Sequence, residues 1–228
     1  MTTATYHRYR GNLETYFDRT AAKAWEQLTS DAPVSGIRAT VRAGRTEMRN
    51  TLLSWLPADM RGARLLDAGC GTGALAVEAA QRGAEVVAID VAGSLVAIAR
   101  ERAPAGLAID WRVGDMLDPA LGHFDHVVAM DSLIHYKASD IVAVLGRLAE
   151  NTRGSIAFTF APQTPLLMAM LGMGRLFPRG NRSPAILPVR DRLLRGLIGD
   201  ALPKARIGRD RRISASFYTS HAMEVVTG

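Results

Sequence analysis

The sequence predicts an α/β protein built on a doubly wound, mostly parallel seven-stranded sheet with an antiparallel C-terminal strand. Strand and helix patterns alternate between residues 63 and 162, which is typical of a parallel sheet with helices on both faces. A glycine-rich turn follows the first of these strands. Two strand-like runs within residues 205–226 predict a hairpin that closes the sheet.

Each element of the alternating region is indicated by its own apolar pattern. Short apolar runs bounded by Gly, Asp or Pro predict strands at 63–69, 85–90, 107–115, 124–131 and 154–162. Longer amphipathic runs predict helices at 73–83, 94–103 and 138–150. The chain therefore reads as one large α/β domain, predicted to occupy residues 61–228.

Residues 1–60 are predicted to form a helical arm or cap. A short helix is expected at 19–28, a turn at 29–36, and a longer helix at 37–56 that ends before Pro57. On this longer helix Arg38, Arg42, Arg45 and Arg49 share one face. That face is either a solvated surface beside a core stripe or a wall that recognises an anion.

An insert is predicted after the fifth strand, at residues 163–200. It contains four prolines and the apolar run PLLMAMLGMGRLF, which includes Met168 and Met170. This run is shorter than the roughly 20 apolar residues that a membrane span needs. It could be a cap over an apolar ligand, a membrane-surface contact or a core helix.

The composition limits location and partners. The first residues lack the apolar core of a secretion signal and Cys70 is the one cysteine, so we expect a cytoplasmic protein. A mean hydropathy of +0.04 excludes several membrane spans. The formal net charge is +6, and 25 of the 28 basic residues are Arg. This composition suits acidic partners and also fits a simple codon bias.

The run LLDAGCGTG, residues 65–73, carries the strongest chemical signal. A strand ends at Asp67, and Gly69, Gly71 and Gly73 follow before a helix. Glycines let a ligand approach the backbone closely. A dinucleotide loop would have a similar spacing, but Asp67 would repel a pyrophosphate and the third glycine extends the pattern.

The loop resembles that of the class I S-adenosylmethionine-dependent methyltransferases, whose domain is Rossmann-like. The resemblance implies that Asp67 helps to hold the methionine ammonium and that Asp90, followed by Val91, binds the ribose. It also implies that Asp115 and Met116 meet the adenine and that Asp131 lies beside the methyl donor. These positions follow four consecutive strands, whose carboxyl ends form the ligand-binding edge of such sheets.

The methyl acceptor is predicted to be a small molecule. The segment after the fourth strand reads DSLIHY, without the prolines of many base-methylating enzymes, and no separate basic and aromatic module is visible. No nucleic-acid partner is therefore expected. The five histidines have no metal-ligand spacing, so no protein-bound metal is expected either.

The segment 16–45 together with DSLIHY resembles the magnesium-protoporphyrin IX methyltransferase family of bacteriochlorophyll-forming bacteria. The resemblance covers nearly the whole chain and implies methyl transfer to one porphyrin propionate. It also implies a transient contact with the porphyrin-binding subunit of magnesium chelatase. Peripheral contact with the photosynthetic membrane is a further expectation.

The residues suit such an acceptor. Arg38, Arg42 and Arg45 could hold a propionate, while Phe17, Met168 and Met170 could contact the apolar ring. Because a propionate is already ionised at neutral pH, we expect His135 and Tyr16 to act as catalytic residues by alignment or hydrogen bonding, not as bases. Tyr16 could instead be a core anchor, and Tyr136 is expected to pack.

Two other functions stay open from the residues alone. One is methylation of another acidic or phenolic small molecule. The other is a non-catalytic partner protein that binds S-adenosylmethionine without turnover.

Overall fold

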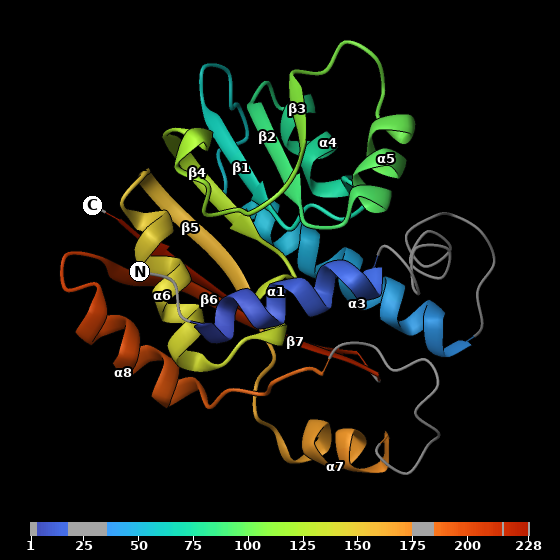
Figure 1. The fold of residues 1–228 in the computed structure, drawn as a ribbon, viewed down its shortest axis with the longest axis vertical. Coiled ribbons are helices and arrows are strands. Elements are labelled where there is room, and N and C mark those ends of the chain that lie inside the picture. The colour runs from blue at the N-terminus through green and yellow to red at the C-terminus, as the bar shows by residue number, and fades with distance from the viewer. Residues whose placement is uncertain (1–3, 18–35, 175–184, 216, 228) are drawn as a thin grey trace.

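The computed structural model describes residues 4–17, 36–174, 185–215 and 217–227. Its centre is a seven-stranded sheet in the order β3-β2-β1-β4-β5-β7-β6 (Figure 1). The strands are β1 (Arg64–Ala68), β2 (Glu85–Asp90), β3 (Ile109–Val113), β4 (Phe124–Ala129), β5 (Thr152–Phe160), β6 (Arg206–Ala215) and β7 (Tyr218–Val226).

The sheet is parallel except for β7. Strands β1 to β5 pair in parallel, and β7 runs antiparallel to both β5 and β6. In the central register Leu66 lies between Val87 and Val127. This arrangement confirms the predicted Rossmann-like sheet, its antiparallel strand and the C-terminal hairpin.

Helices follow the first, second and fourth strands as the sequence predicted, and further helices lie in the arm and the insert. The helices at residues 4–16 and 191–201 were not predicted individually. They are α1 (Ala4–Tyr16), α3 (Gly36–Ser54), α4 (Ala74–Gln81), α5 (Gly93–Arg102), α6 (Ala138–Ala149), α7 (Pro165–Gly174) and α8 (Asp191–Ala201). The expected long arm helix corresponds to α3 and stops three residues before Pro57. The short helix expected at 19–28 and most of the following turn lie outside the described residues. None of the helices in the described ranges is both long and apolar enough to span a membrane.

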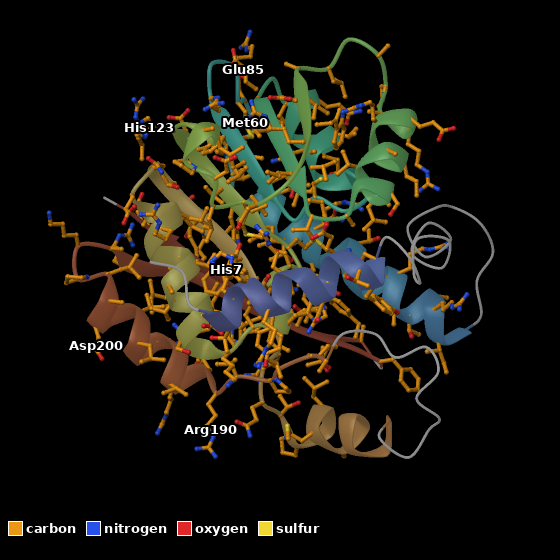
Figure 2. All side chains as sticks on the ribbon, viewed as in Figure 1. His7, Met60, Glu85, His123, Arg190 and Asp200 are labelled. Atoms are coloured by element: carbon orange, nitrogen blue, oxygen red, sulfur yellow. The ribbon has the colours of Figure 1, made fainter. Side chains whose placement is uncertain are left out.

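Apolar side chains pack on both faces of the sheet (Figure 2). Alternate residues of β1 point to opposite sides. Leu66 joins a cluster with residues of α1, α6 and α8. Leu65 joins a second cluster with residues of α3 and α4. The sheet is therefore covered on both sides, as its continuous apolar strands require.

The arm region contributes two helices in different settings. Met48, Leu52 and Leu53 of α3 are fully or almost fully buried and pack into the second cluster. Helix α1 instead crosses the carboxyl ends of β3 and β4, because Tyr6 contacts Asp115 and stacks on Tyr136. Helix α3 thus shares the core of the main sheet, and the division at residue 60 stays a prediction.

The insert after β5 contains α7 and α8. Its return segment is fixed beside the strand ends, since the Val189 amide donates to the Ala161 carbonyl at 2.8 Å and the Leu187 amide donates to the Ile134 carbonyl at 2.9 Å. Helix α8 then covers the sheet through Leu194 and Ile198. The insert therefore approaches the segment that follows β4.

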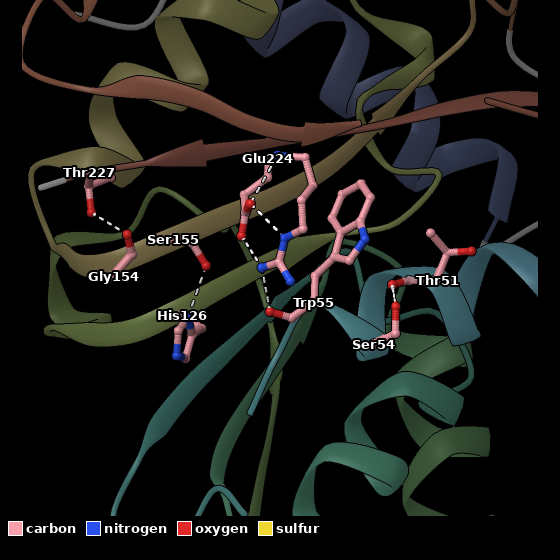
Figure 3. Close-up of polar contacts among 9 residues, drawn as sticks. Thr51, Ser54, Trp55, His126, Gly154, Ser155, Glu224 and Thr227 are labelled. Atoms are coloured by element: carbon pink, nitrogen blue, oxygen red, sulfur yellow. Dashed lines mark hydrogen bonds and ion pairs between the residues drawn. The ribbon is translucent and has the colours of Figure 1, made fainter. Parts of the chain in front are cut away.

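The outer strand β6 is tied to the end of α3 by Arg209. Its guanidinium donates to both Glu224 carboxylate oxygens and to the Trp55 carbonyl oxygen. Figure 3 shows Glu224 and Trp55 at the two ends of this contact. The Glu224 carboxylate is buried, so the charge of Arg209 compensates its desolvation.

Candidate active site

A pocket lies at the carboxyl ends of β1, β2, β3 and β4, between the sheet and the two arm helices. It brings together eleven of the residues that the sequence indicated: Phe17, Arg42, Arg45, Asp67, Gly69, Gly71, Asp90, Val91, Met116, Asp131 and His135. The position fits the general rule for ligand sites in parallel sheets. It does not by itself assign a role to any of these side chains.

The glycine turn has the backbone geometry that only glycine adopts readily. Gly69, Gly71 and Gly73 have φ angles of 87°, 54° and 80°. A Cβ atom on Gly69 would collide with the Ser132 side chain, and one on Gly73 would collide with the Trp111 ring. Gly73 begins helix α4 and is not part of the pocket wall. The turn therefore brings its backbone close to the site.

Asp90 fixes the shape of this turn. One of its carboxylate oxygens accepts from the Gly71 amide at 2.9 Å and the other accepts from the Ala92 amide at 3.0 Å. The glycine turn, the end of β2 and the start of α5 are thereby joined at one carboxylate. Val91 follows at the pocket wall.

Asp67 is a buried carboxylate with one oxygen atom that accepts no hydrogen bond from the described residues. Its side chain is 2% exposed, and its Oδ2 atom has no hydrogen-bond partner among the described residues. Burial, followed by the nearby Asp90 charge, raises the pKa of Asp67 to about 7. A cationic ligand group beside Oδ2 would relieve both effects.

Asp115, which follows β3, is held by the arm. Its Oδ1 atom accepts from the Tyr6 hydroxyl at 2.6 Å, and its Oδ2 atom accepts from Arg10 at the same distance. Tyr6 is 2% exposed and stacks on Tyr136 with 5.2 Å between ring centroids. Asp115 lies outside the pocket wall, while its neighbours Gly114 and Met116 form part of it. Tyr136 packs, as the sequence indicated.

The arginine stripe of α3 divides into different environments. Arg45 pairs with Asp131 at 2.5 Å and Arg49 pairs with Glu78 at 2.6 Å. Arg42, Arg45 and Arg49 all line the pocket, whereas Arg38 is exposed on the first turn of the helix and does not. The stripe is therefore part pocket wall and part structural contact.

His135 is buried at the end of a short 3-10 helix, η3 (Leu133–His135). Burial lowers the pKa of His135 below its usual value. Its Nδ1 atom lies 3.2 Å from the Ala185 carbonyl oxygen, which only accepts, so Nδ1 carries the proton. The neutral ring then has its lone pair on Nε2.

The other residues predicted to contact the methyl acceptor do not gather at the pocket. Tyr16 ends α1 and contacts the Phe17 ring edge-to-face at 5.2 Å, but only Phe17 lines the pocket. Met168 lies on α7, is 44% exposed and is not in the pocket wall. The Met170 side chain lies outside the described residues.

Several residues that complete the site had no signal in the sequence. Tyr6 and Arg10 contact a carboxylate more than 100 positions away, and Tyr218 contacts Asp131 from the C-terminal strand. Such pairs depend on tertiary contacts and have no local pattern. Within the described ranges, no three His, Cys, Asp or Glu side chains are placed to hold a metal ion.

Comparison with known proteins identifies the family. The family model described as "Magnesium-protoporphyrin IX methyltransferase C-terminus" matches residues 129–227, and a methyltransferase-domain model matches residues 65–154. The magnesium-protoporphyrin O-methyltransferase of Rhodobacter capsulatus is 50% identical over 222 residues, which cover 96% of this chain and 97% of that protein. The chain belongs to the magnesium-protoporphyrin O-methyltransferase family.

A more distant comparison, with Synechocystis, agrees in sequence and in structure. The Synechocystis magnesium-protoporphyrin O-methyltransferase is 29% identical over 216 residues, covering 92% of this chain and 93% of that protein. A crystal structure of magnesium protoporphyrin IX methyltransferase from Synechocystis PCC 6803 with bound SAH superposes with a TM-score of 0.84 at 27% identity. It covers 95% of this chain and 98% of the solved one.

The pocket described above has features that fit S-adenosylmethionine. The Oδ2 atom of Asp67, which accepts no hydrogen bond from the part of the chain that the structure describes, suits an ammonium group. The glycine turn, with φ angles that exclude most side chains, leaves its backbone open to a ligand. These two observations concern the methionine end of the molecule.

Proposed function

We infer that the protein transfers a methyl group from S-adenosylmethionine to one propionate carboxylate of magnesium-protoporphyrin IX, giving the monomethyl ester used in bacteriochlorophyll biosynthesis. The observation that carries this proposal is one pocket with two chemically different walls. All of the following residues line it: Asp67, Gly69 and Gly71, which we assign to a donor wall, and Arg42, Arg45 and His135, which we assign to an acceptor wall.

The first wall is proposed to bind the donor. Asp67 would hold the methionine ammonium, Asp90 and Val91 the ribose edge, and Met116 the adenine. Asp115 is proposed to support the adenine end, where its contacts with Tyr6 and Arg10 also attach α1. Bound S-adenosylmethionine supplies an electrophilic methyl group on a sulfonium.

The second wall is proposed to bind the acceptor. Arg42 and Arg45 provide the positive charge that a propionate requires. Phe17 offers an apolar surface to the porphyrin ring. Tyr16, whose ring contacts that of Phe17 at the end of α1, is proposed to align the acceptor or to donate a hydrogen bond to it. Met168 and Met170 on α7 are proposed to contact the exposed part of the macrocycle.

The protein's part in the reaction is to align the propionate carboxylate with the methyl group. A propionic acid has a pKa of about 4.3 and is ionised at pH 7, so no base has to remove a proton. Neutral His135 donates through Nδ1 to the Ala185 carbonyl, and donation to the propionate would require protonation, which burial disfavours. We therefore assign His135 a positioning role, since it attaches the insert to the segment after β4.

The experiment is to incubate the purified protein with labelled S-adenosylmethionine and magnesium-protoporphyrin IX and to identify the product by mass. We expect one label per porphyrin and S-adenosylhomocysteine in equal amount. Phenolic acceptors and unrelated dicarboxylic acids serve as controls. Labelling of those acceptors without the porphyrin would contradict the proposal.

Two interactions in the cell extend the proposal. One is a transient contact with the porphyrin-binding subunit of magnesium chelatase, and the other is peripheral contact of this cytoplasmic protein with the photosynthetic membrane. The apolar helix α7, with Met168 exposed, is the surface that supports membrane contact. The same assay tests both when the chelatase subunit or anionic lipid vesicles are added, because each contact should accelerate delivery of the porphyrin. Unchanged rates would contradict them.

A further inference from the structure

Asp131 has an unusual backbone for a non-glycine residue. Its φ angle is 53°, in the left-handed region, directly after β4. Its amide donates to the Thr159 hydroxyl at 2.7 Å. Aspartate tolerates this conformation better than most residues, but the conformation needs support from its surroundings. The surroundings of Asp131 therefore determine where its carboxylate points.

The Asp131 carboxylate is surrounded by protein donors from three directions. Arg45 of α3 donates at 2.5 Å, and the Tyr218 hydroxyl of β7 lies 3.1 Å and 3.3 Å from the two carboxylate oxygens. Thr159 and Ser220 add hydroxyl contacts at 3.3 Å and 3.4 Å. The side chain of Asp131 is only 6% exposed. Its charge is thus compensated inside the protein, chiefly by Arg45.

Tyr218 is held in place by a close approach of α3 to β7. A Cβ atom at Gly44 would lie 2.5 Å from the Tyr218 ring atom Cδ1. Glycine inside a helix costs about 1 kcal/mol relative to alanine, and here it provides the space that the ring occupies. Burial raises the pKa of Tyr218 above its usual value, so its hydroxyl keeps the proton that it donates.

These contacts form a closed path from Gly44 to Tyr218, Asp131 and back to Arg45, the neighbour of Gly44. Arg45 and Asp131 line the pocket, and Tyr218 does not. We propose that Tyr218 is a positioning residue for methyl transfer, which fixes the Arg45 guanidinium through Asp131 so that Arg45 can hold the reacting propionate. This inference rests on the proposed acceptor.

The test is Tyr218→Phe, which removes the hydroxyl and keeps the ring against Gly44. We expect the KM and the Kd for magnesium-protoporphyrin both to rise about tenfold, as for loss of a hydrogen bond to a charged group. The Kd for S-adenosylmethionine should stay within about twofold of wild type, because the hydroxyl lies outside the donor wall. Thermal unfolding of both proteins monitors the fold.

Thr219→Val is the matched control. Thr219 precedes Ser220 on the same strand, and its hydroxyl contacts Ser214 at an exposed position. This variant should keep the wild-type KM. If Thr219→Val raised the KM as much as Tyr218→Phe, the effect would be a general disturbance of β7 and the inference would be wrong.

A double-mutant comparison tests the path itself. In an Arg45→Gln background, Tyr218→Phe should change the Kd for magnesium-protoporphyrin by less than about twofold, because the residue that it positions has been removed. An equal effect in both backgrounds would overturn the inference. An inactive wild type would instead refute the proposed acceptor, so the two failures are distinguishable.

Discussion

Asp67 places a carboxylate where ionisation is unfavourable until a cation arrives. Its Oδ2 atom has no hydrogen-bond partner among the described residues, and burial raises its pKa to about 7. Between the unfolded value of about 3.9 and this raised value, the folded state retains a proton that the unfolded state loses. The contribution of Asp67 to stability therefore falls as pH rises through this range.

Asp67→Asn should consequently raise the stability of the protein while it weakens donor binding. Without ligand, the variant should unfold at a higher temperature than wild type, most clearly above pH 7, because the costly charge is absent. Its affinity for S-adenosylmethionine should fall by about tenfold or more, since a charge-assisted hydrogen bond is lost. Calorimetry from pH 6 to pH 8 should show wild-type affinity increasing with pH and the variant unchanged.

Asp200→Asn is the charge-matched control for this comparison. Asp200 is exposed near the end of α8, at the periphery of the molecule and away from the pocket (Figure 2). The substitution should leave both measurements at wild-type values. Equal pH dependence in Asp67→Asn and wild type would refute the role assigned to Asp67.

At the scale of elements, the contact between β6 and α3 depends on one charge pair. Glu224 is 4% exposed, and hydrogen bonds from Arg209 hold its pKa below the usual range. Arg209 also donates to the Trp55 carbonyl at 2.6 Å and lies over the Trp55 ring. Removing the guanidinium leaves a buried acceptor without its main partner.

We expect Arg209→Ala to lower the free energy of unfolding by about 1–3 kcal/mol at pH 7. A carboxyl group with a lowered folded pKa stabilises above its unfolded pKa and loses that contribution as pH falls. The difference from wild type should therefore shrink below about pH 4. Urea unfolding at several pH values measures this difference in the free energy of unfolding.

Arg211→Ala provides the control on the same strand. Arg211 pairs with Glu47 at 3.3 Å, but both side chains are more than half exposed. Such pairs contribute about 0–1 kcal/mol. A loss from Arg211→Ala as large as that from Arg209→Ala would contradict the distinction between buried and exposed pairs.

The strands and the helices between them were predictable because each depends on a local pattern, whereas α1 was not predicted individually. The strands containing Asp67 and Asp90, the glycine turn and the C-terminal hairpin all follow from periodicity and turn residues. The contacts of Tyr218 with Asp131 and of Tyr6 with Asp115 join residues 87 and 109 positions apart. No local pattern encodes these contacts, so the sequence did not predict which residues hold Asp131 and Asp115 in place.

At the scale of the whole molecule, the pocket depends on the arm and the sheet being one packed unit. Helix α3 contributes Met48 and Leu52 to the core and Arg42 and Arg45 to the pocket. The sequence indicated the arginine stripe but not that Arg45 would pair with a carboxylate while it lines the pocket, nor that Arg38 would lie outside the pocket. This arrangement arises only when the partner carboxylates, such as Asp131, fold against the helix.

The central claim is that this assembly aligns an already ionised carboxylate and does not deprotonate it. The most direct measurement is the single-turnover rate of methyl transfer from pH 5 to pH 9 at saturating S-adenosylmethionine, for wild type and His135→Ala. Saturation removes the effect of Asp67 ionisation on donor binding.

The wild-type rate should be nearly constant across this range, because a propionate with a pKa of about 4.3 is largely ionised throughout. His135→Ala should be slower by about 100-fold, the order expected for a misplaced acceptor, and equally independent of pH, with unchanged porphyrin binding. The opposite result would be a wild-type rate that rises with pH up to about 6.5 and a variant that lacks this rise. That outcome would make His135 a general base and contradict the account.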